Sequence, residues 1–189
     1  MSLPELLDRK VFELFERQIT NEKWATTYLI TGEELTKKRV LAVSFAKALN
    51  CARRPFQISC ICDICTRIEN GSHPDVKWYG LDEEANSIKI GEVRDFKNWL
   101  AFKPYEAKVK VFVFQGADRL TAEAQNALLK SLEEPPPGNV ILLLVEHARN
   151  LFDTIVSRSI EIKVPPFASD EIRELFLHEG ISREEAEFL

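Results

Sequence analysis

The segment KVFVFQGADRLTAEAQNALLKSLEEPPPGNVILLLV, residues 110–145, decides the fold of this chain. Its two ends are nearly uninterrupted apolar runs, which predict strands over 110–114 and 140–145. Between them Thr121 is a typical helix cap, and the run Pro135-Pro136-Pro137-Gly138 ends the helix that follows it. Apolar strands joined by a helix are typical of parallel strands covered on both faces, so the segment predicts a three-layer α/β domain.

The same alternation extends to both sides of this segment. Further strands are predicted over 27–31, 76–79 and 160–164, with helices from Thr36 to Leu49 and from Gly91 to Phe102. Ser2-Leu3-Pro4-Glu5 has the form of a capping box for a first amphipathic helix. Pro165-Pro166 then breaks the alternation, and Ser169 is expected to open a new helix.

Composition describes an ordinary globular protein. The chain has 189 residues, of which 45% are hydrophobic and 29% charged, and its net charge of −5 provides no general basic surface for nucleic acid. No apolar run approaches the ~20 residues of a membrane-spanning helix, and the amino terminus lacks the features of a secretory signal. We therefore expect a cytoplasmic protein with no membrane contact.

The residues after the predicted strand at 27–31 stand where a phosphate-binding loop would stand. In the pattern G-x-x-x-x-G-K-[ST], backbone N–H groups and the lysine bind phosphates, and the hydroxyl binds magnesium. Gly32 and Lys38 fit, but Lys37 replaces the second glycine and Arg39 the Ser/Thr. A side chain at the glycine position would crowd a phosphate. The pattern alone leaves open whether this is a degenerate nucleotide site or was never one.

The strand at 110–114 also ends without the expected chemistry. In P-loop enzymes this strand leads into acidic residues that hold magnesium. Here Gln115 and Gly116 occupy that position. Asp118 lies three residues beyond the magnesium position, and we expect it to cap the turn before the next helix.

Four cysteines, Cys51, Cys60, Cys62 and Cys65, lie within fifteen residues. Clustered thiols in a reducing compartment favour a metal over disulfides, and four thiolates are typical of a closed, structural Zn²⁺ site. The alternatives are free cysteines or disulfides. The pair Cys60 and Cys62 has C-x-C spacing rather than the common C-x2-C, and His73 is a conceivable fourth ligand.

Two other groups of residues could bind nucleic acid or could have only a structural role. Lys37, Lys38 and Arg39, together with Arg53 and Arg54, could contact a phosphate backbone, or they could be a solvated helix start and a charged edge of the insert. The three tryptophans, Trp24, Trp78 and Trp99, are expected to fill the core or an interface, because the sequence around them has no interleaved basic stripe.

Residues 117–159 resemble the clamp-loader ATPase module of the AAA+ class, and AFKPYEAKVKVFVF at 101–114 continues the match. HPDV at 73–76 and the cysteine insert resemble the bacterial branch. The resemblance implies a P-loop/AAA+ type domain over 1–165 with a zinc-module insert at about 51–72. It also implies that 166–189 begin a small helical lid domain and that the chain is a fragment, monomeric without the family's helical collar.

Within this family the sequence resembles the delta-prime group of the bacterial DNA polymerase III clamp loader. The motor subunits have an intact P-loop, an Asp-Glu strand end and a Ser-Arg-Cys motif. Here the first two are degraded, and the third persists as Ser157-Arg158-Ser159. The resemblance implies a relict P-loop that does not hydrolyse ATP, so the chain would not itself be an enzyme. No ATP is expected in its own site, and weak nucleotide binding without hydrolysis is the alternative. The cysteine spacing departs by one residue from the family's C-x8-C-x2-C-x2-C.

The resemblance also implies a role for Arg158. It would act in trans as an arginine finger on ATP bound by a neighbouring subunit, with Ser157 orienting its loop and Ser159 structural. The alternative is a surface arginine paired with Asp153 or Glu161.

The implied partners are a gamma/tau-type ATPase subunit, the delta subunit, and, through the complex, the sliding clamp and primed DNA. Two other functions stay open. One is an active ATPase motor subunit of the same complex, and the other is a zinc-stabilised DNA-binding adaptor, which would show steeply salt-dependent DNA affinity.

Overall fold

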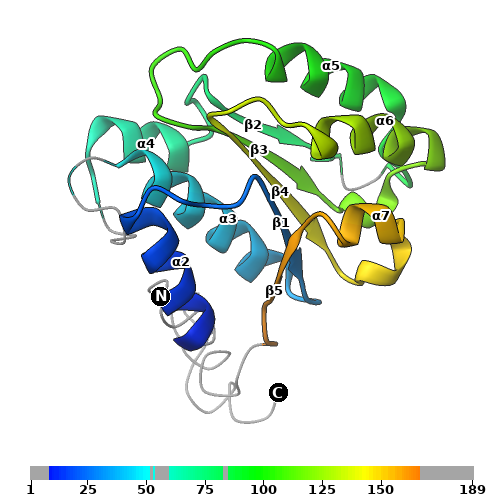
Figure 1. The fold of residues 1–189 in the computed structure, drawn as a ribbon, viewed down its shortest axis with the longest axis horizontal. Helices are drawn as coiled ribbons and strands as arrows, with labels where there is room; N and C mark the ends of the chain where they lie inside the picture. Colours follow the sequence, from blue (N-terminus) through cyan, green and yellow to red (C-terminus); the bar gives the residue numbers. More distant parts are fainter. Residues whose placement is uncertain (1–8, 52, 54–59, 83–84, 167–189) are drawn as a thin grey trace, which may run out of the picture.

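The computed structural model describes residues 9–51, 53, 60–82 and 85–166, which fold around one parallel sheet (Figure 1). Its five strands are β1 (Thr27–Thr31), β2 (Val76–Tyr79), β3 (Lys110–Gln115), β4 (Asn139–Val145) and β5 (Ile160–Lys163). Their order is β2-β3-β4-β1-β5, and every neighbouring pair is parallel. The predicted parallel sheet is confirmed, and each strand lies within one residue of its predicted bounds.

Helices cover both faces of the sheet (Figure 1). One face packs against α2 (Arg9–Thr20), α3 (Leu35–Asn50) and α4 (Asp63–Glu69). The other packs against α5 (Ile90–Leu100), α6 (Ala122–Glu133) and α7 (Asp153–Val156), with the short 3-10 turns η1 (Ala117–Arg119) and η2 (Ala148–Asn150) between them.

The strand residues divide between the two faces by the period of two that extended backbone imposes. Val111 and Val113 of β3 pack on the α3 side, whereas Phe112 and Phe114 pack on the α5 and α6 side. All these side chains are buried, because both faces are covered. The predicted three-layer α/β architecture is confirmed.

Helix boundaries follow the predicted signals where local chemistry sets them. The Thr121 Oγ1 accepts a hydrogen bond from the Ala124 N–H at 3.2 Å and caps α6, as predicted. The short helices α4 and α7 were not predicted. The proposed capping box at Ser2 and the helix expected from Ser169 lie outside the described residues.

Parallel strands place all their carboxyl ends at one edge of the sheet, which we call the carboxyl edge, and all their amino ends at the opposite, amino edge. Ligands of open α/β sheets bind outside the carboxyl ends of the strands.

Across the described residues no helix is both long enough and apolar enough to cross a membrane.

Candidate functional site at the carboxyl edge

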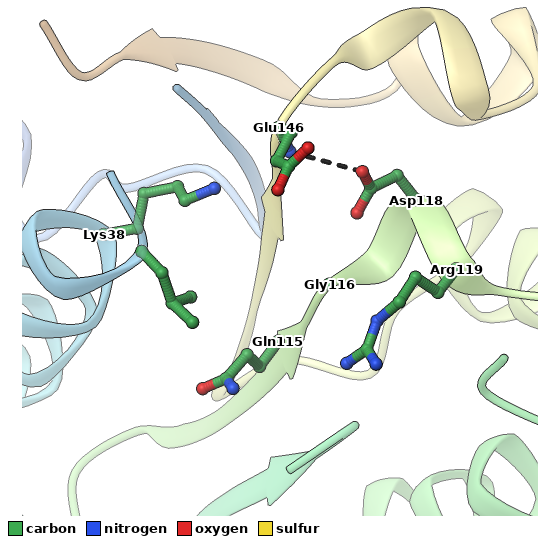
Figure 2. A pocket seen from close by; sticks show the side chains of 7 residues that line it. Lys38, Gln115, Gly116, Asp118, Arg119 and Glu146 are labelled. Atoms are coloured by element: carbon green, nitrogen blue, oxygen red, sulfur yellow. Dashed lines mark hydrogen bonds between the residues drawn. The ribbon is translucent and has the colours of Figure 1, made fainter. Parts of the chain in front are cut away.

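A cavity of about 320 Å³ lies at the carboxyl edge, where β3, β4 and the start of α3 meet (Figure 2). Its lining comprises Leu35, Lys38, Gln115, Gly116, Asp118, Arg119 and Glu146. The structure thus brings the lysine of the loop pattern together with the residues that follow β3, as expected for two parts of one nucleotide site. The chemistry of the lining decides what this cavity accepts.

The Lys38 side chain hydrogen-bonds to the protein backbone. Its Nζ donates to the carbonyl of Gly32 at 2.5 Å and to the carbonyl of Val145 at 2.9 Å, and the residue is only 2% exposed. Burial lowers the pKa of Lys38, although the carboxylates of Asp118, Glu146 and Glu34 favour its charged form. The ammonium group therefore ties the ends of β1 and β4 together instead of standing free for a phosphate.

The loop before α3 is too short to surround a phosphate group. Only residues 32–34 separate β1 from α3, and the Lys38 N–H already donates to the Glu34 carbonyl as part of the helix. Gly32 has a φ of +149°, and a Cβ there would lie 2.6 Å from the Val164 carbonyl oxygen. The glycine is required by this close approach of the chain after β5, whether or not a ligand binds.

Lys37 and Arg39 both point away from the cavity. The Lys37 Nζ donates to the Pro166 carbonyl at 3.2 Å, so its side chain does not crowd a phosphate as the sequence suggested. The Arg39 guanidinium lies 5.9 Å from the centre of the Trp78 ring. Both interpretations of the basic cluster fail for Lys37 and Lys38, because each is at least 98% buried and so neither solvated nor available to DNA.

The residues after β3 line the cavity with oxygen atoms. The Asp118 carboxylate accepts a hydrogen bond from the Glu146 N–H at 3.4 Å (Figure 2). Asp118 does not cap the turn before α6 as predicted, because the 3-10 turn η1 that contains it has no side-chain cap. Within the described ranges neither carboxylate forms an ion pair, so both leave negative charge at the cavity.

Arg119 is the second cation of the cavity, and its guanidinium also hydrogen-bonds to backbone carbonyls. It donates to the carbonyls of Gly80, Asp82 and Ala85 in the loop after β2. Gly116 has a φ of +67°, and a Cβ there would come within 2.5 Å of the Arg119 Nε. With both cations bonded to carbonyls and two carboxylates in the lining, the cavity disfavours a triphosphate anion.

Arg158 lies outside this cavity, in the turn between α7 and β5. Its Nη1 donates to the Thr154 carbonyl at 3.0 Å, and its Nη2 lies 3.2 Å from the Glu133 carboxylate of α6. Its partner is therefore Glu133 and not Asp153 or Glu161, the two acids considered from sequence. With 38% of its side chain exposed, the guanidinium is accessible to another molecule.

The neighbouring serines hold the Arg158 turn through local hydrogen bonds. The Ser157 hydroxyl donates to the Thr154 carbonyl at 3.2 Å, and the Ser159 hydroxyl to the Ile155 carbonyl at 2.8 Å. Gln125, which sequence reasoning missed, joins α6 to the segment just before α7: its amide accepts from the Phe152 N–H and donates to the Asn150 carbonyl. A buried polar residue on the apolar side of a helix was the available signal.

The four cysteine sulfurs form a cluster that can hold a metal ion, since all lie within 4.8 Å of one another. The Cys51 sulfur is 3.6 Å from that of Cys60 and 4.0 Å from that of Cys62. Tetrahedral Zn²⁺ with Zn–S bonds of about 2.3 Å separates its sulfur ligands by about 3.8 Å, so the donors fit zinc despite the C-x-C spacing. All four cysteines are free in the structure, and no disulfide joins any two of them.

The thiols of this cluster differ in acidity. A hydrogen bond from the Cys65 N–H lowers the pKa of Cys62 to about 7, whereas burial raises the pKa of Cys65. His73 is outside the cluster: its Nδ1 accepts the Asp75 N–H at 3.1 Å, and its Nε2 lies 3.8 Å from the Glu106 carboxylate. No histidine ligand is needed.

Comparisons with known proteins show what this chain is similar to. A family model described as DNA polymerase III, delta subunit, matches residues 7–168. The Bacillus subtilis DNA polymerase III subunit delta' is 29% identical over 183 residues, covering 97% of this chain and 55% of that protein. The DNA polymerase III subunit tau of the same organism is 33% identical over 149 residues, covering 78% of this chain and 26% of that protein.

Among solved structures, a DNA polymerase III gamma subunit-related protein from Thermotoga maritima superposes with a TM-score of 0.65 and 26% sequence identity. The alignment covers 88% of this chain and 51% of that protein. This chain therefore spans about half the length, or less, of the relatives it matches.

Proposed function

This chain belongs to the DNA polymerase III delta-subunit family, and on that premise we propose that it acts as a delta-prime-type clamp-loader subunit that does not hydrolyse ATP itself. In this role it helps to load the sliding clamp on primed DNA. Its direct partners are a gamma/tau-type ATPase subunit and the delta subunit.

One contrast supports the proposal above all others. The lysine of the relict P-loop is 2% exposed and bonded to two carbonyls, whereas Arg158 is 38% exposed and bonded to the Thr154 carbonyl and to the Glu133 carboxylate at the surface. The first arrangement leaves the Lys38 ammonium unavailable to a nucleotide bound by the chain itself. The second leaves a guanidinium that can bind the terminal phosphates of a nucleotide on a neighbouring subunit.

In this proposal the Arg158 guanidinium stabilises negative charge on the phosphoryl group transferred in the neighbouring site. An arginine supplied in trans raises the rate of such a step by about 10³–10⁵-fold. The hydrogen bonds of Ser157 and Ser159 fix the turn on which the arginine stands, so that little conformational entropy is lost when it engages.

The test is ATP turnover by the reconstituted loader, stimulated by clamp and primed DNA, with Arg158→Ala in the full-length subunit. We expect turnover at one motor site to fall sharply while the complex still assembles. Arg149→Ala is the matched control, because Arg149 is another exposed arginine on the same side of the sheet. Unchanged turnover in the Arg158 variant would reduce the role of the subunit to scaffolding.

Nucleotide and DNA binding by the isolated chain distinguish the two alternative functions. An active motor subunit, favoured by the similarity to subunit tau, requires ATP binding with an affinity comparable to that of the motor subunits. A DNA-binding adaptor requires DNA affinity that falls steeply with salt. We expect neither from this chain.

We also propose that Cys51, Cys60, Cys62 and Cys65 hold one structural Zn²⁺. Four thiolates leave no open position for water, so such an ion stabilises the insert and takes no part in catalysis. Zinc sites of this kind contribute on the order of 10–16 kcal/mol in small zinc-finger peptides.

Elemental analysis should find one zinc ion per chain, and a strong chelator should unfold the region around α4 while the sheet persists. Local unfolding is measured by hydrogen exchange. The double variant Cys51→Ser/Cys60→Ser serves as the control, in which the chelator should have no further effect. A metal-free protein with unchanged exchange would contradict the proposal.

A further inference from the structure

The amino edge of the sheet, opposite the relict nucleotide cavity, bears a second concave site. A concavity of about 460 Å³ is lined by residues 102–105 together with Pro74, Asp75, Trp99 and Lys110. We call it the amino-edge hollow. Its volume falls within the range of about 300–1,000 Å³ typical of binding pockets.

Three aromatic side chains around this hollow are exposed to solvent. Trp99 is 39% exposed, Phe102 65% and Tyr105 85%, and together they are three of the exposed large hydrophobic residues of the described chain. Aromatic residues are enriched in protein interfaces, and exposed apolar groups gathered around a concavity mark interaction sites.

The backbone around the hollow is held rigidly by two buried charges. The Asp75 carboxylate accepts hydrogen bonds from the N–H groups of Tyr105, Glu106 and Ala107 at 2.8 to 2.9 Å. The Lys110 Nζ donates to the carbonyls of Trp99 and Phe102 at the end of α5. The hollow is therefore preformed, which lowers the entropic cost of binding.

The charge balance around the hollow is positive. Lys110 is 98% buried, yet its third N–H has no hydrogen-bond acceptor among the residues that the structure describes. Asp75 is the carboxylate that favours its charged form, and the Asp75 oxygens are occupied by three N–H groups. Lys103 lines the hollow without an ion pair in the described part of the chain, and the Lys77 Nζ lies 4.2 Å from the centre of the Trp99 ring.

We propose that the amino-edge hollow is a docking site for a segment of a partner protein in which an apolar side chain lies next to Asp or Glu. The apolar side chain fills the space between the aromatic rings, and the carboxylate is attracted by Lys103 and Lys110. A single-stranded nucleic acid fits less well, because Lys77 covers one face of Trp99 and the chain carries a net charge of −5.

This inference rests on the proposed place of the chain in a multi-protein complex, and its test uses that complex. The photo-crosslinking residue p-benzoylphenylalanine replaces Tyr105 in the full-length subunit, which is assembled with the other loader subunits, the clamp and primed DNA. The same replacement at Glu16, on the exposed side of α2, is the control. Mass spectrometry then identifies what each position reaches.

We expect crosslinks from position 105 to a partner protein, in a peptide with an apolar residue beside Asp or Glu. Crosslinks to DNA alone, or no more adduct than at position 16, would overturn the docking site while the clamp-loader function stands, provided that the complex has assembled. Failure of the unsubstituted subunit to enter the complex would overturn both.

The crosslinked partner then allows a quantitative test. Phe102→Ala and Lys103→Glu should each weaken its binding by about 10-fold or more, the usual cost of removing a central interface contact. Ile61→Ala, at another exposed apolar residue that does not line the hollow, should leave the affinity unchanged. Equal affinities for all three variants would overturn the proposal.

Discussion

A buried lysine lies at each edge of the sheet. Both lysines donate hydrogen bonds to two backbone carbonyls, but the charged groups around them differ. Lys38, at the carboxyl edge, donates to two carbonyls at the ends of β1 and β4. Lys110, at the amino edge, donates to two carbonyls at the end of α5. Both residues are 2% exposed, and burial lowers the pKa of both.

The difference lies in the carboxylates. Lys38 has Asp118, Glu146 and Glu34 around it, whereas Lys110 has only Asp75, whose oxygens already bind three N–H groups. Acids therefore outnumber bases around Lys38 in the carboxyl-edge cavity, whereas Lys110 has a single carboxylate nearby. We therefore expect the placement of acids, rather than the bonding of the lysines, to decide which ligand charge each site accepts.

The largest expected effect is at Asp75. Asp75→Asn replaces a carboxylate oxygen that accepts two N–H groups by an amide donor, and we expect it to lower the free energy of unfolding by about 2–5 kcal/mol at pH 7. The measurement is urea unfolding. Glu123→Gln, an exposed acid in the first turn of α6, is the control.

The pH dependence of this effect has a defined sign. Burial alone would raise the pKa of Asp75, but its three backbone N–H donors and His73 outweigh burial, and the net pKa is lowered. The stabilisation is therefore complete above the unfolded pKa of about 3.9 and is lost as the pH falls through the lower folded pKa. If the difference in unfolding free energy between Asp75→Asn and the parent protein does not become smaller below pH 4, the carboxylate charge does not contribute to stability.

The two lysines should have similar, intermediate effects on stability. Lys38→Met and Lys110→Met each keep an apolar stem of similar length and leave buried carbonyls without a donor, which costs about 1–3 kcal/mol. The free energies of unfolding of the two variants measure this cost, and Lys130→Met, at an exposed position of α6, is the control.

The same two variants should differ in their effects on ATP turnover and on partner binding. Lys38→Met should leave the neighbour's ATP turnover unchanged in the assembled loader, whereas Lys110→Met should weaken binding at the amino-edge hollow. If Lys38→Met abolished turnover without loss of assembly, the carboxyl-edge cavity would be a working nucleotide site, and the comparison would fail.

The smallest expected effect is at the exposed pair of Arg158 and Glu133. Surface ion pairs contribute about 0.2–1 kcal/mol, so Glu133→Gln should change stability by no more than this. Because the pair holds Arg158 against its own chain, its removal should raise turnover at the neighbouring site by about 1.4- to 5-fold. Glu134→Gln, the adjacent exposed acid, should change nothing, and a fall in turnover would mean that Glu133 positions the arginine.

Much of the fold was predictable because its signals are local. The apolar runs at β3 and β4 and the Thr121 cap depend on residues a few positions apart, and all three predictions are confirmed. The α7 helix was missed, because a segment of only four residues is too short for a periodic pattern.

The candidate site was predictable only in part. The structure places Lys38, Gln115 and Gly116, which the sequence assigned to two degraded parts of a nucleotide site, around one cavity, since residues after parallel strands meet at one edge. The sequence contained no indication of Arg119 or Glu146 in the same cavity, and it assigned the wrong partners to Asp118 and Arg158.

The sequence by itself determined the parallel sheet, its covering helices and the gathering of four cysteines, because periodicity and short spacing act between near neighbours in the chain. Only the tertiary structure decided what each charge does. The Lys38 ammonium finds its acceptor in Val145, 107 residues away, and Asp75 finds its donors about 30 residues away. Such partners are fixed by which strands lie side by side and how their loops pack, and no local pattern encodes that arrangement.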